Sequence, residues 1–362
     1  MRASDPGVRS WRPAPGSPDK HRLDPTHPAP AIPIGAPFPG HGLSSRLFSA
    51  VPMSVTALFW IPALIWASTW HVILYQLGEV PPLNSVAYRF MVAAALMAAL
   101  TRWQGHSLKL PLRWHLPLAV VGCIQFGLNY CSTYESERHL PSGLVAVLFS
   151  LMVFGNAAAG AVFFRQPFTR RFFLASLVAV SGVVMVFWPE IAGVQARPGL
   201  AQGLMFGGAA VVAAVVGNVL TLMLTRRGLP LMPVLSWAML YGSLSLLLFS
   251  VLSGTGLHVS AKPSYWLSLL YLAVMGSTLA FWFYFRLAQS QGAGKAAMVS
   301  VIVPVIALGV SAVLENWQPT WMAGVGMLLA VGGVLWATRP APAAPAASSG
   351  PSAPDTEAGH GD

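Results

Sequence analysis

The fold is decided by PSGLVAVLFSLMVFGNAAAGAVF at residues 141–163, a stretch without a single charged side chain. As a helix rising 1.5 Å per residue, a run of this length crosses the ~30 Å hydrocarbon core of a bilayer. Residues 200–225, LAQGLMFGGAAVVAAVVGNVLTLMLT, form a second such run. Hydrocarbon offers no partner to backbone N–H and C=O groups, so each run is predicted to be a helix.

The composition of the whole chain supports this interpretation. Of 362 residues, 55% are hydrophobic and 9% are charged, and the mean hydropathy is +0.62. Soluble domains carry about a quarter charged residues, so the sequence predicts an all-α integral membrane protein that crosses the bilayer many times. The formal net charge is +10, but its Lys and Arg residues are dispersed over short loops and tails. This dispersal argues against a nucleic-acid partner and leaves the lipid bilayer as the expected surrounding.

Apolar runs between charged or Pro/Gly breaks predict ten transmembrane helices. Their approximate cores are 54–76, 83–101, 115–134, 141–163, 170–188, 200–225, 231–252, 265–285, 294–314 and 320–338.

Charges in the loops predict the orientation of these helices. If the N-terminus is cytoplasmic, the loops on that side hold Arg102, Lys109, Arg113, Arg165, Arg170, Arg171, Arg226, Arg227, Arg286, Lys295 and Arg339. The opposite loops hold only Arg138, Arg197 and Lys262. Such a bias follows the positive-inside rule, so we expect both termini in the cytoplasm and the protein in the inner (plasma) membrane.

The chain repeats itself at an offset of 151 residues. YESERHLPSG (134–143) aligns with FRLAQSQGAG (285–294), and AVSGVV (179–184) aligns with AVGGVL (330–335). Arg286 stands where the first copy has Glu135, as expected if the matching loops lie on opposite sides of the membrane. Five helices per copy is an odd number, so the sequence predicts two inverted five-helix repeats, at 53–190 and 198–339.

Two proline-rich tails flank the repeats. Residues 1–52 hold no sustained apolar run, and residues 340–362 are of low complexity, so both are predicted to be disordered. Met53 begins the apolar stretch MSVTALFW, which prompts the hypothesis that translation starts there and that residues 1–52 are an over-long gene assignment.

Three motifs carry a resemblance to a known family. They are IWASTW (65–70), VPPLNSVAYRF (80–90) and VSVIVPVIALGVSAVLEN (299–316). Together with the repeat, they resemble the drug/metabolite transporter superfamily, EamA type. The resemblance implies ten helices in two inverted repeats, transport of a small molecule, most often efflux, and a role of the last helix of each repeat in packing or in a homodimer.

Polar and aromatic side chains within the helices are the candidates for a substrate cavity, because such groups are costly in hydrocarbon and usually face a cavity or another helix. The candidates are Trp66, Trp70, His71, Tyr75, Arg89, Gln125, Asn129, Tyr130, Asn156, Asn218, Ser277, Trp282 and Tyr284. Uncharged amides and aromatic rings suit a small polar or amphipathic solute. The alternative for each amide is a hydrogen bond between helices.

Two of these candidates carry a more specific hypothesis. Arg89 lies about one turn inside the second helix, at its outer end. It either attracts an anion at the mouth of the cavity, or makes a structural hydrogen bond to loop carbonyls, or extends its charge to the headgroups. His71 can gain or lose a proton near neutral pH and is therefore a candidate for proton coupling. Its alternative is a neutral imidazole that bridges two helices. The acidic residues near the spans, Glu137 among them, are expected at the outer ends.

Prolines and glycines are expected to shape the helices. Pro62 and Pro304 lie inside the first and ninth helices, where each makes either a gating hinge or a static kink. Gly203 and Gly207, and the glycines of the tenth helix, are expected to allow close helix contacts.

The sequence therefore predicts a secondary transporter that moves a small organic metabolite, amino-acid-like or drug-like, by alternating access. No P-loop is present, so ATP is not the expected energy source. No cluster of catalytic polar groups is found in the sequence, so we predict no enzyme activity, cofactor or metal site. Two alternatives remain: a lipid-modifying membrane enzyme, and a membrane sensor or scaffold that transports nothing.

Overall fold

Helices make up every element that the structure, a computed structural model, describes. The described residues are 53–78, 80–140, 142–193, 198–314 and 320–339, and they belong to one unit of the chain, Ser44–Asp362. No strand occurs in these ranges, as expected when each backbone polar group must be satisfied within its own segment. The two predicted tails lie outside the described residues.

The first half of the chain supplies eleven of the described helical elements. They are α2 (Val55–Ile73), η2 (Leu74–Gln76), α3 (Pro82–Trp103), η3 (Leu112–Trp114), α4 (His115–Val121), η4 (Gly122–Leu128), α5 (Asn129–His139), α6 (Ser142–Ser150), α7 (Met152–Phe164), α8 (Arg170–Val186) and α9 (Trp188–Gly193).

The second half supplies seven more within the described ranges. They are α10 (Leu200–Arg226), α11 (Leu231–Leu252), α12 (Pro263–Tyr271), η6 (Leu272–Leu279), α13 (Ala280–Gln291), α14 (Ala293–Leu314) and α15 (Trp321–Thr338).

Eight helical stretches of the described chain are long and apolar enough to cross a membrane. They are Val55–Gln76, Pro82–Trp103, Leu112–His139, Leu144–Phe164, Leu200–Arg226, Leu231–Leu252, Pro263–Gln291 and Trp321–Thr338. The other two predicted spans correspond to α8, which has 17 residues and begins with two arginines, and to α14, whose apolar part is described over Ala293–Ala307. The protein is thus an all-helical, multi-pass membrane protein, and the count of ten spans stays a prediction.

The third and eighth spans are longer than the sequence predicted. α5 continues to His139 and α13 to Gln291, so most of the two aligned connectors is helical. In the first connector, Arg138 donates a hydrogen bond to the Glu135 carboxylate at 3.0 Å, an i,i+3 pair of the kind that supports a helix. The charged residues of the two connectors therefore do not end the helices.

The fourth span is interrupted where the sequence predicted a continuous helix. The Leu151 N–H donates to the Leu148 carbonyl, and the Phe154 N–H donates to the Leu151 carbonyl, both at 3.1 Å. This three-residue spacing separates α6 from α7. The matching place in the second half is residue 302, close to Pro304, which lies inside α14.

Both long spans contain a π-helical segment, and the two segments occupy equivalent places in the halves. They are η4 (Gly122–Leu128) and η6 (Leu272–Leu279), so their C-terminal ends are 151 residues apart. π-Helical turns are rare and often occur at functional sites. A shared, rare irregularity at the same offset as the sequence repeat shows that the two halves have the same local geometry here.

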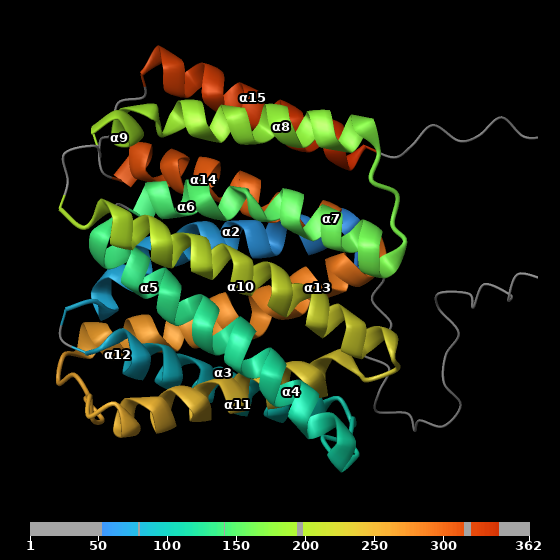
Figure 1. The fold of residues 1–362 in the computed structure, drawn as a ribbon, viewed down its shortest axis with the longest axis vertical. Coiled ribbons are helices and arrows are strands. Elements are labelled where there is room, and N and C mark those ends of the chain that lie inside the picture. The colour runs from blue at the N-terminus through green and yellow to red at the C-terminus, as the bar shows by residue number, and fades with distance from the viewer. Residues whose placement is uncertain (1–52, 79, 141, 194–197, 315–319, 340–362) are drawn as a thin grey trace, which may run out of the picture. The chain divides into compact units, whose positions relative to one another are not determined.

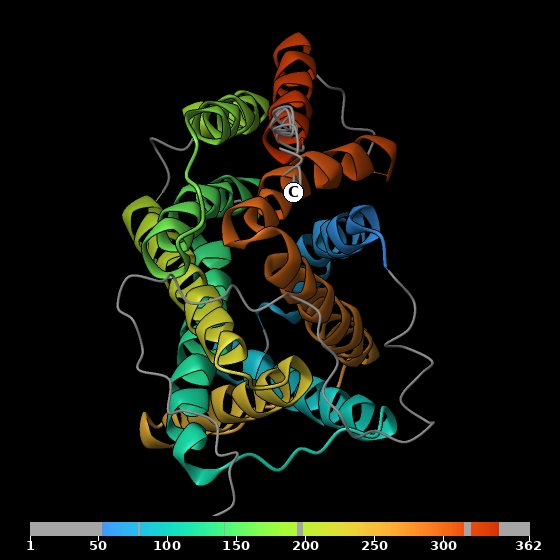
Figure 2. The ribbon, with the colours of Figure 1, turned by 90° about the vertical axis from the view of Figure 1, so that its right-hand side faces the viewer.

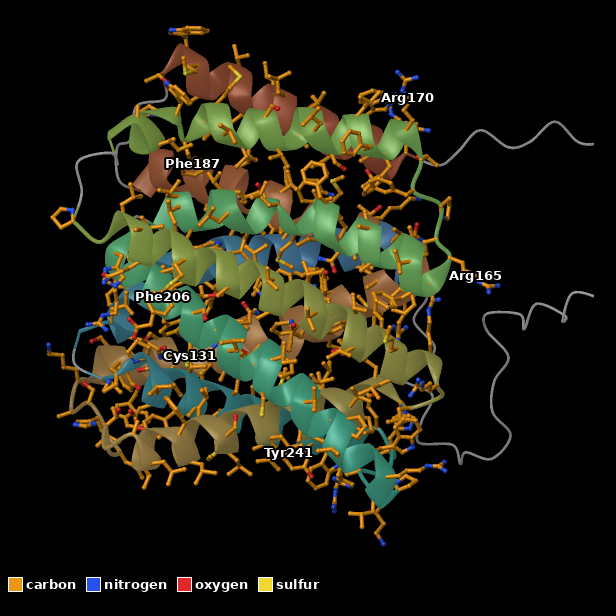
Figure 3. All side chains as sticks on the ribbon, in the orientation of Figure 1. Cys131, Arg165, Arg170, Phe187, Phe206 and Tyr241 are labelled. Atoms are coloured by element: carbon orange, nitrogen blue, oxygen red, sulfur yellow. The ribbon has the colours of Figure 1, made fainter. Side chains whose placement is uncertain are left out.

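Contacts between the halves follow the same correspondence. α3 packs on α11, α8 packs on α15, and α7 packs on α14, so each of these helices contacts its own counterpart. Other contacts come in matching pairs, since α2 packs on α13 and α14 while α10 packs on α5 and α7. Figures 1 and 2 both show α8 and α15 side by side at one edge of the other helices. Figure 3 shows Arg165 and Arg170 projecting from one end of the helices, the end that the sequence predicts to face the cytoplasm.

The contact between α8 and α15 depends on glycine. A Cβ atom added to Gly326 would lie 2.6 Å from the Gly182 carbonyl oxygen and 2.9 Å from the Val186 backbone nitrogen. A Cβ added to Gly324, on the same helix, would meet nothing within 4 Å. Close approach is thus required at one of these two glycines and not at the other.

Gly326→Ala is therefore expected to destabilise the protein by about 1–3 kcal/mol, because the backbones of α8 and α15 must separate to admit a methyl group. Gly324→Ala is the matched control and should be neutral or slightly stabilising, since alanine has the higher helix propensity. The apparent unfolding temperature of each purified variant in detergent checks this difference. Equal unfolding temperatures for the two variants would contradict the described packing.

Candidate functional site

A cavity of about 90 Å³ lies between the two halves. A water molecule needs roughly 10–15 Å³ on this measure, so the cavity has room for a small solute. Eight of the thirteen predicted site residues line it: Trp66, Trp70, Arg89, Gln125, Asn129, Tyr130, Asn218 and Tyr284. The structure thus brings together residues from α2, α3, η4, α5, α10 and α13.

Polar residues that the prediction omitted also line the cavity, namely Thr69, Thr133 and Ser300. Each of their hydroxyls bonds to a carbonyl of its own helix, three or four residues earlier. The spacing of Asn129 and Thr133, four residues apart, would have placed the second on the face of the first.

Buried amides connect four helices beside the cavity. Gln125 Nε2 donates to Asn218 Oδ1 at 3.2 Å, and Asn218 Nδ2 donates to Asn156 Oδ1 at 3.3 Å and to the Tyr284 hydroxyl at 3.0 Å. Asn156 Nδ2 donates in turn to the Met152 carbonyl at 2.9 Å. Asn156 therefore supports the cavity wall through Asn218 and does not line the cavity itself. This network joins the third and fourth spans to the sixth and eighth.

Arg89 faces the cavity while being 1% exposed. Its Nε donates to the Ser277 hydroxyl at 2.9 Å and its Nη1 donates to the Tyr134 hydroxyl at 3.4 Å. The guanidinium carbon lies 4.7 Å from the centre of the Tyr130 ring and 5.3 Å from that of Phe90. Among the described residues no carboxylate forms an ion pair with it. Aromatic faces and hydroxyl groups hold this charge, which leaves it able to attract an anion.

Two buried acceptors near the cavity have no hydrogen-bond partner within the described chain. They are Gln125 Oε1 and Asn129 Oδ1, both on residues that line the cavity. Buried polar atoms are nearly always hydrogen-bonded in folded proteins. These oxygens are therefore suited to accept hydrogen bonds from a donor group of a bound solute.

Tryptophan side chains form one wall of the cavity. Trp66 Nε1 donates to the Gly276 carbonyl at 3.0 Å, and its ring lies 5.4 Å from that of Phe281. The ring of Trp70 lies 5.7 Å from that of Phe149. The hydrogen bond from Trp66 ends on the π-helical segment η6, so the irregular segment directly positions this wall.

A group of buried polar residues that the sequence did not predict lies beside Arg89. The Tyr134 hydroxyl donates to Gln76 Oε1 at 2.8 Å, and both residues are at most 1% exposed. Glu137, expected at an outer end of the spans, is 8% exposed and therefore buried. It lies four residues beyond Thr133 and eight beyond Asn129, and this helical spacing is the signal that could have located it.

The remaining predicted residues do not line the cavity. His71 and Tyr75 are exposed on the outside of α2 and η2, with their rings 5.8 Å apart. Ser277 contacts the site only as the acceptor for Arg89, and Trp282 is half-buried against Phe283. Pro62 lies one turn before Trp66 in α2, and Pro304 follows the cavity residue Val303 in α14, so both prolines adjoin the cavity wall.

Known proteins resemble the chain over most of its membrane part. A probable amino-acid metabolite efflux pump of Salmonella typhimurium is 24% identical over 278 residues, which are 75% of this chain and 90% of that protein. The inner membrane transporter YedA of Escherichia coli is 25% identical over 248 residues, 68% of this chain and 78% of that protein.

A solved crystal structure shares the fold, with a TM-score of 0.66, 20% sequence identity, and coverage of 78% of this chain and 96% of that chain. The sequence pattern of the EamA-like transporter family matches residues 53–188 and, a second time, residues 202–339. Because these two matches cover nearly all of the described helices, this chain belongs to the EamA-like transporter family of membrane transporters.

Proposed function

We propose that this protein is a secondary transporter that moves a small organic metabolite out of the cell by alternating access. The observation that carries this proposal is a cavity between the two halves with a buried cation, Arg89, facing it. In transporters built from repeats, the substrate site lies between the repeats, and their relative movement opens it to either side in turn. A sealed core packed only for stability would not keep such a cation without an ion pair.

The correspondence between the two halves supports an inverted-repeat arrangement, which this movement requires. Each half has the family pattern, and the π-helical segments and helix contacts correspond at the same offset. Arginines gathered in the loops at one end are typical of a cytoplasmic end, and this supports ten spans with both termini in the cytoplasm of an inner membrane.

The polar groups of the cavity favour an amino-acid-like solute. Arg89 provides a positive charge for a carboxylate, and the oxygens of Gln125 and Asn129 provide acceptors for an ammonium or hydroxyl group. The tryptophans offer apolar and aromatic surface to the rest of the molecule. The name of the Salmonella relative, an amino-acid metabolite efflux pump, points to the same class of solute.

Arg89→Gln is expected to lower transport of amino acids about ten- to hundredfold, because a charge-assisted hydrogen bond to the substrate carboxylate is lost. The measurement is uptake of radiolabelled amino acids into proteoliposomes, beside uptake of the matching amino alcohols, which lack the carboxylate. The unmodified protein should prefer the acids, and the variant should lose that preference.

Arg138→Gln serves as the matched control, since Arg138 is an exposed arginine of the same end of the helices, paired with Glu135. It should transport as the unmodified protein does. An unchanged preference for the acids in Arg89→Gln would exclude this role of Arg89, whereas the absence of any uptake by the unmodified protein would favour an enzyme or a scaffold.

Neighbouring residues of α2 offer a second test. Trp70→Ala is expected to reduce transport about tenfold or more because Trp70 lines the cavity, while His71→Gln should change it less than about twofold because His71 lies on the outside of the helix. Initial uptake rates in the same proteoliposomes provide the comparison. A larger loss of transport for His71→Gln than for Trp70→Ala would contradict this placement and show that His71, and not Trp70, faces the transport pathway.

A further inference from the structure

Glu137 is the one acidic side chain that is buried within the described ranges of the chain. Neither of its carboxylate oxygens has a hydrogen-bond partner among the described residues. Burying an ionised carboxylate without a partner costs several kcal/mol, more than a single helix contact returns. A residue kept in such a place calls for an explanation other than stability.

The position of Glu137 relates it to the cavity. It lies on α5 one helical turn beyond Thr133, which lines the cavity, and toward the end of the helix at His139. Tyr134, three residues before Glu137 on α5, is buried and hydrogen-bonded to the buried Gln76. Across the helices, the Ser136 hydroxyl donates to the Gly203 carbonyl at 2.9 Å, which joins α5 to α10. Glu137 therefore belongs to the buried layer between the cavity and the outer ends of the helices.

The charges around Glu137 are few. Arg89 of α3, whose Nη1 donates to the Tyr134 hydroxyl one turn before Glu137 on α5, forms no ion pair with Glu137 in the described chain. On α5 itself, Glu135 and Arg138 pair with one another, and His139 stacks on Phe206 of α10. α6 and the outer half of α10, which also pack on α5, contain no charged residue.

We propose that Glu137 is the proton-binding residue of the transport cycle, an inference that rests on the proposed function. It holds a proton while the outer end of the cavity is closed. When that end opens, the carboxyl group meets water and gives the proton to it. The resulting carboxylate, in the field of Arg89, competes with the carboxylate of the substrate for the same cation, so that proton release favours substrate release to the outside. The carboxylate takes a proton back from the external water as that end closes again, so no proton crosses the membrane in this step.

This mechanism predicts a conformational equilibrium that depends on external pH. Opening releases one proton, so a rise in external pH favours the open form and a fall favours the closed form. For a single proton the equilibrium changes by about tenfold for each pH unit at most. Glu137→Gln keeps the shape of the side chain and cannot release a proton, so its equilibrium should not follow external pH in this way.

Cysteine accessibility measures the opening without any substrate. In a background in which Cys123 and Cys131 are replaced by serine, Thr133→Cys places a thiol in the cavity, one turn below Glu137. Right-side-out membrane vesicles are treated with a membrane-impermeant maleimide while the external pH is raised through neutrality. Both forms carry the same thiol, so its own pH dependence cancels when the labelling rate of the Glu137 protein is divided by that of its Glu137→Gln form.

We expect this ratio to rise severalfold per pH unit. Glu135→Gln is the matched control, two residues away on the same helix, partly exposed and ion-paired, and it should keep the full pH response. A ratio that stays constant with pH would overturn the role of Glu137 while leaving transport itself untouched. Absence of labelling in all forms at every pH would show that the outer end does not open, which would contradict alternating access and the proton mechanism together.

Discussion

A polar group inside hydrocarbon must find its hydrogen-bond partner within the protein. In this chain the backbone meets that requirement through helices alone in the described ranges, and the side chains meet it by turning inward. The amides of Gln125, Asn156 and Asn218 bond to one another across spans, and each is at most 2% exposed. The polar interior that results is what makes a solute cavity possible in a protein whose outer surface is apolar.

The same requirement explains how a charged side chain, that of Arg89, is held inside the protein. Its charge is held by two hydroxyl groups and two aromatic faces, none of which neutralises it. In the proposed function, an anion that enters the cavity completes this set of partners. The cation is held in place before any ligand arrives, so little of the binding free energy would be lost in reorganisation.

Much of this organisation could be predicted from the sequence. The uncharged runs predicted most of the helices. Eight of the thirteen predicted residues line the cavity because polar side chains within a span are costly in lipid and usually face the protein interior. The side that His71 faces could not be predicted, because only the rotation of the helix decides it. The burial of Glu137 could not be deduced from composition either, because it depends on the extension of α5 to His139.

The paired π-helical segments have a consequence for how these spans tolerate change. A π-turn takes up one residue more than an α-helical turn. Deleting one residue within Gly122–Leu128 would let the span close into a regular helix, and Asn129, Thr133 and Glu137 would keep nearly their present direction because the turn loses only its extra residue. A deletion within α5 has no extra residue to remove and would rotate the side chains beyond it by about 100° around the axis, out of the interior. The π-helical segment is therefore the place where this span can lose a residue while its buried face stays as it is.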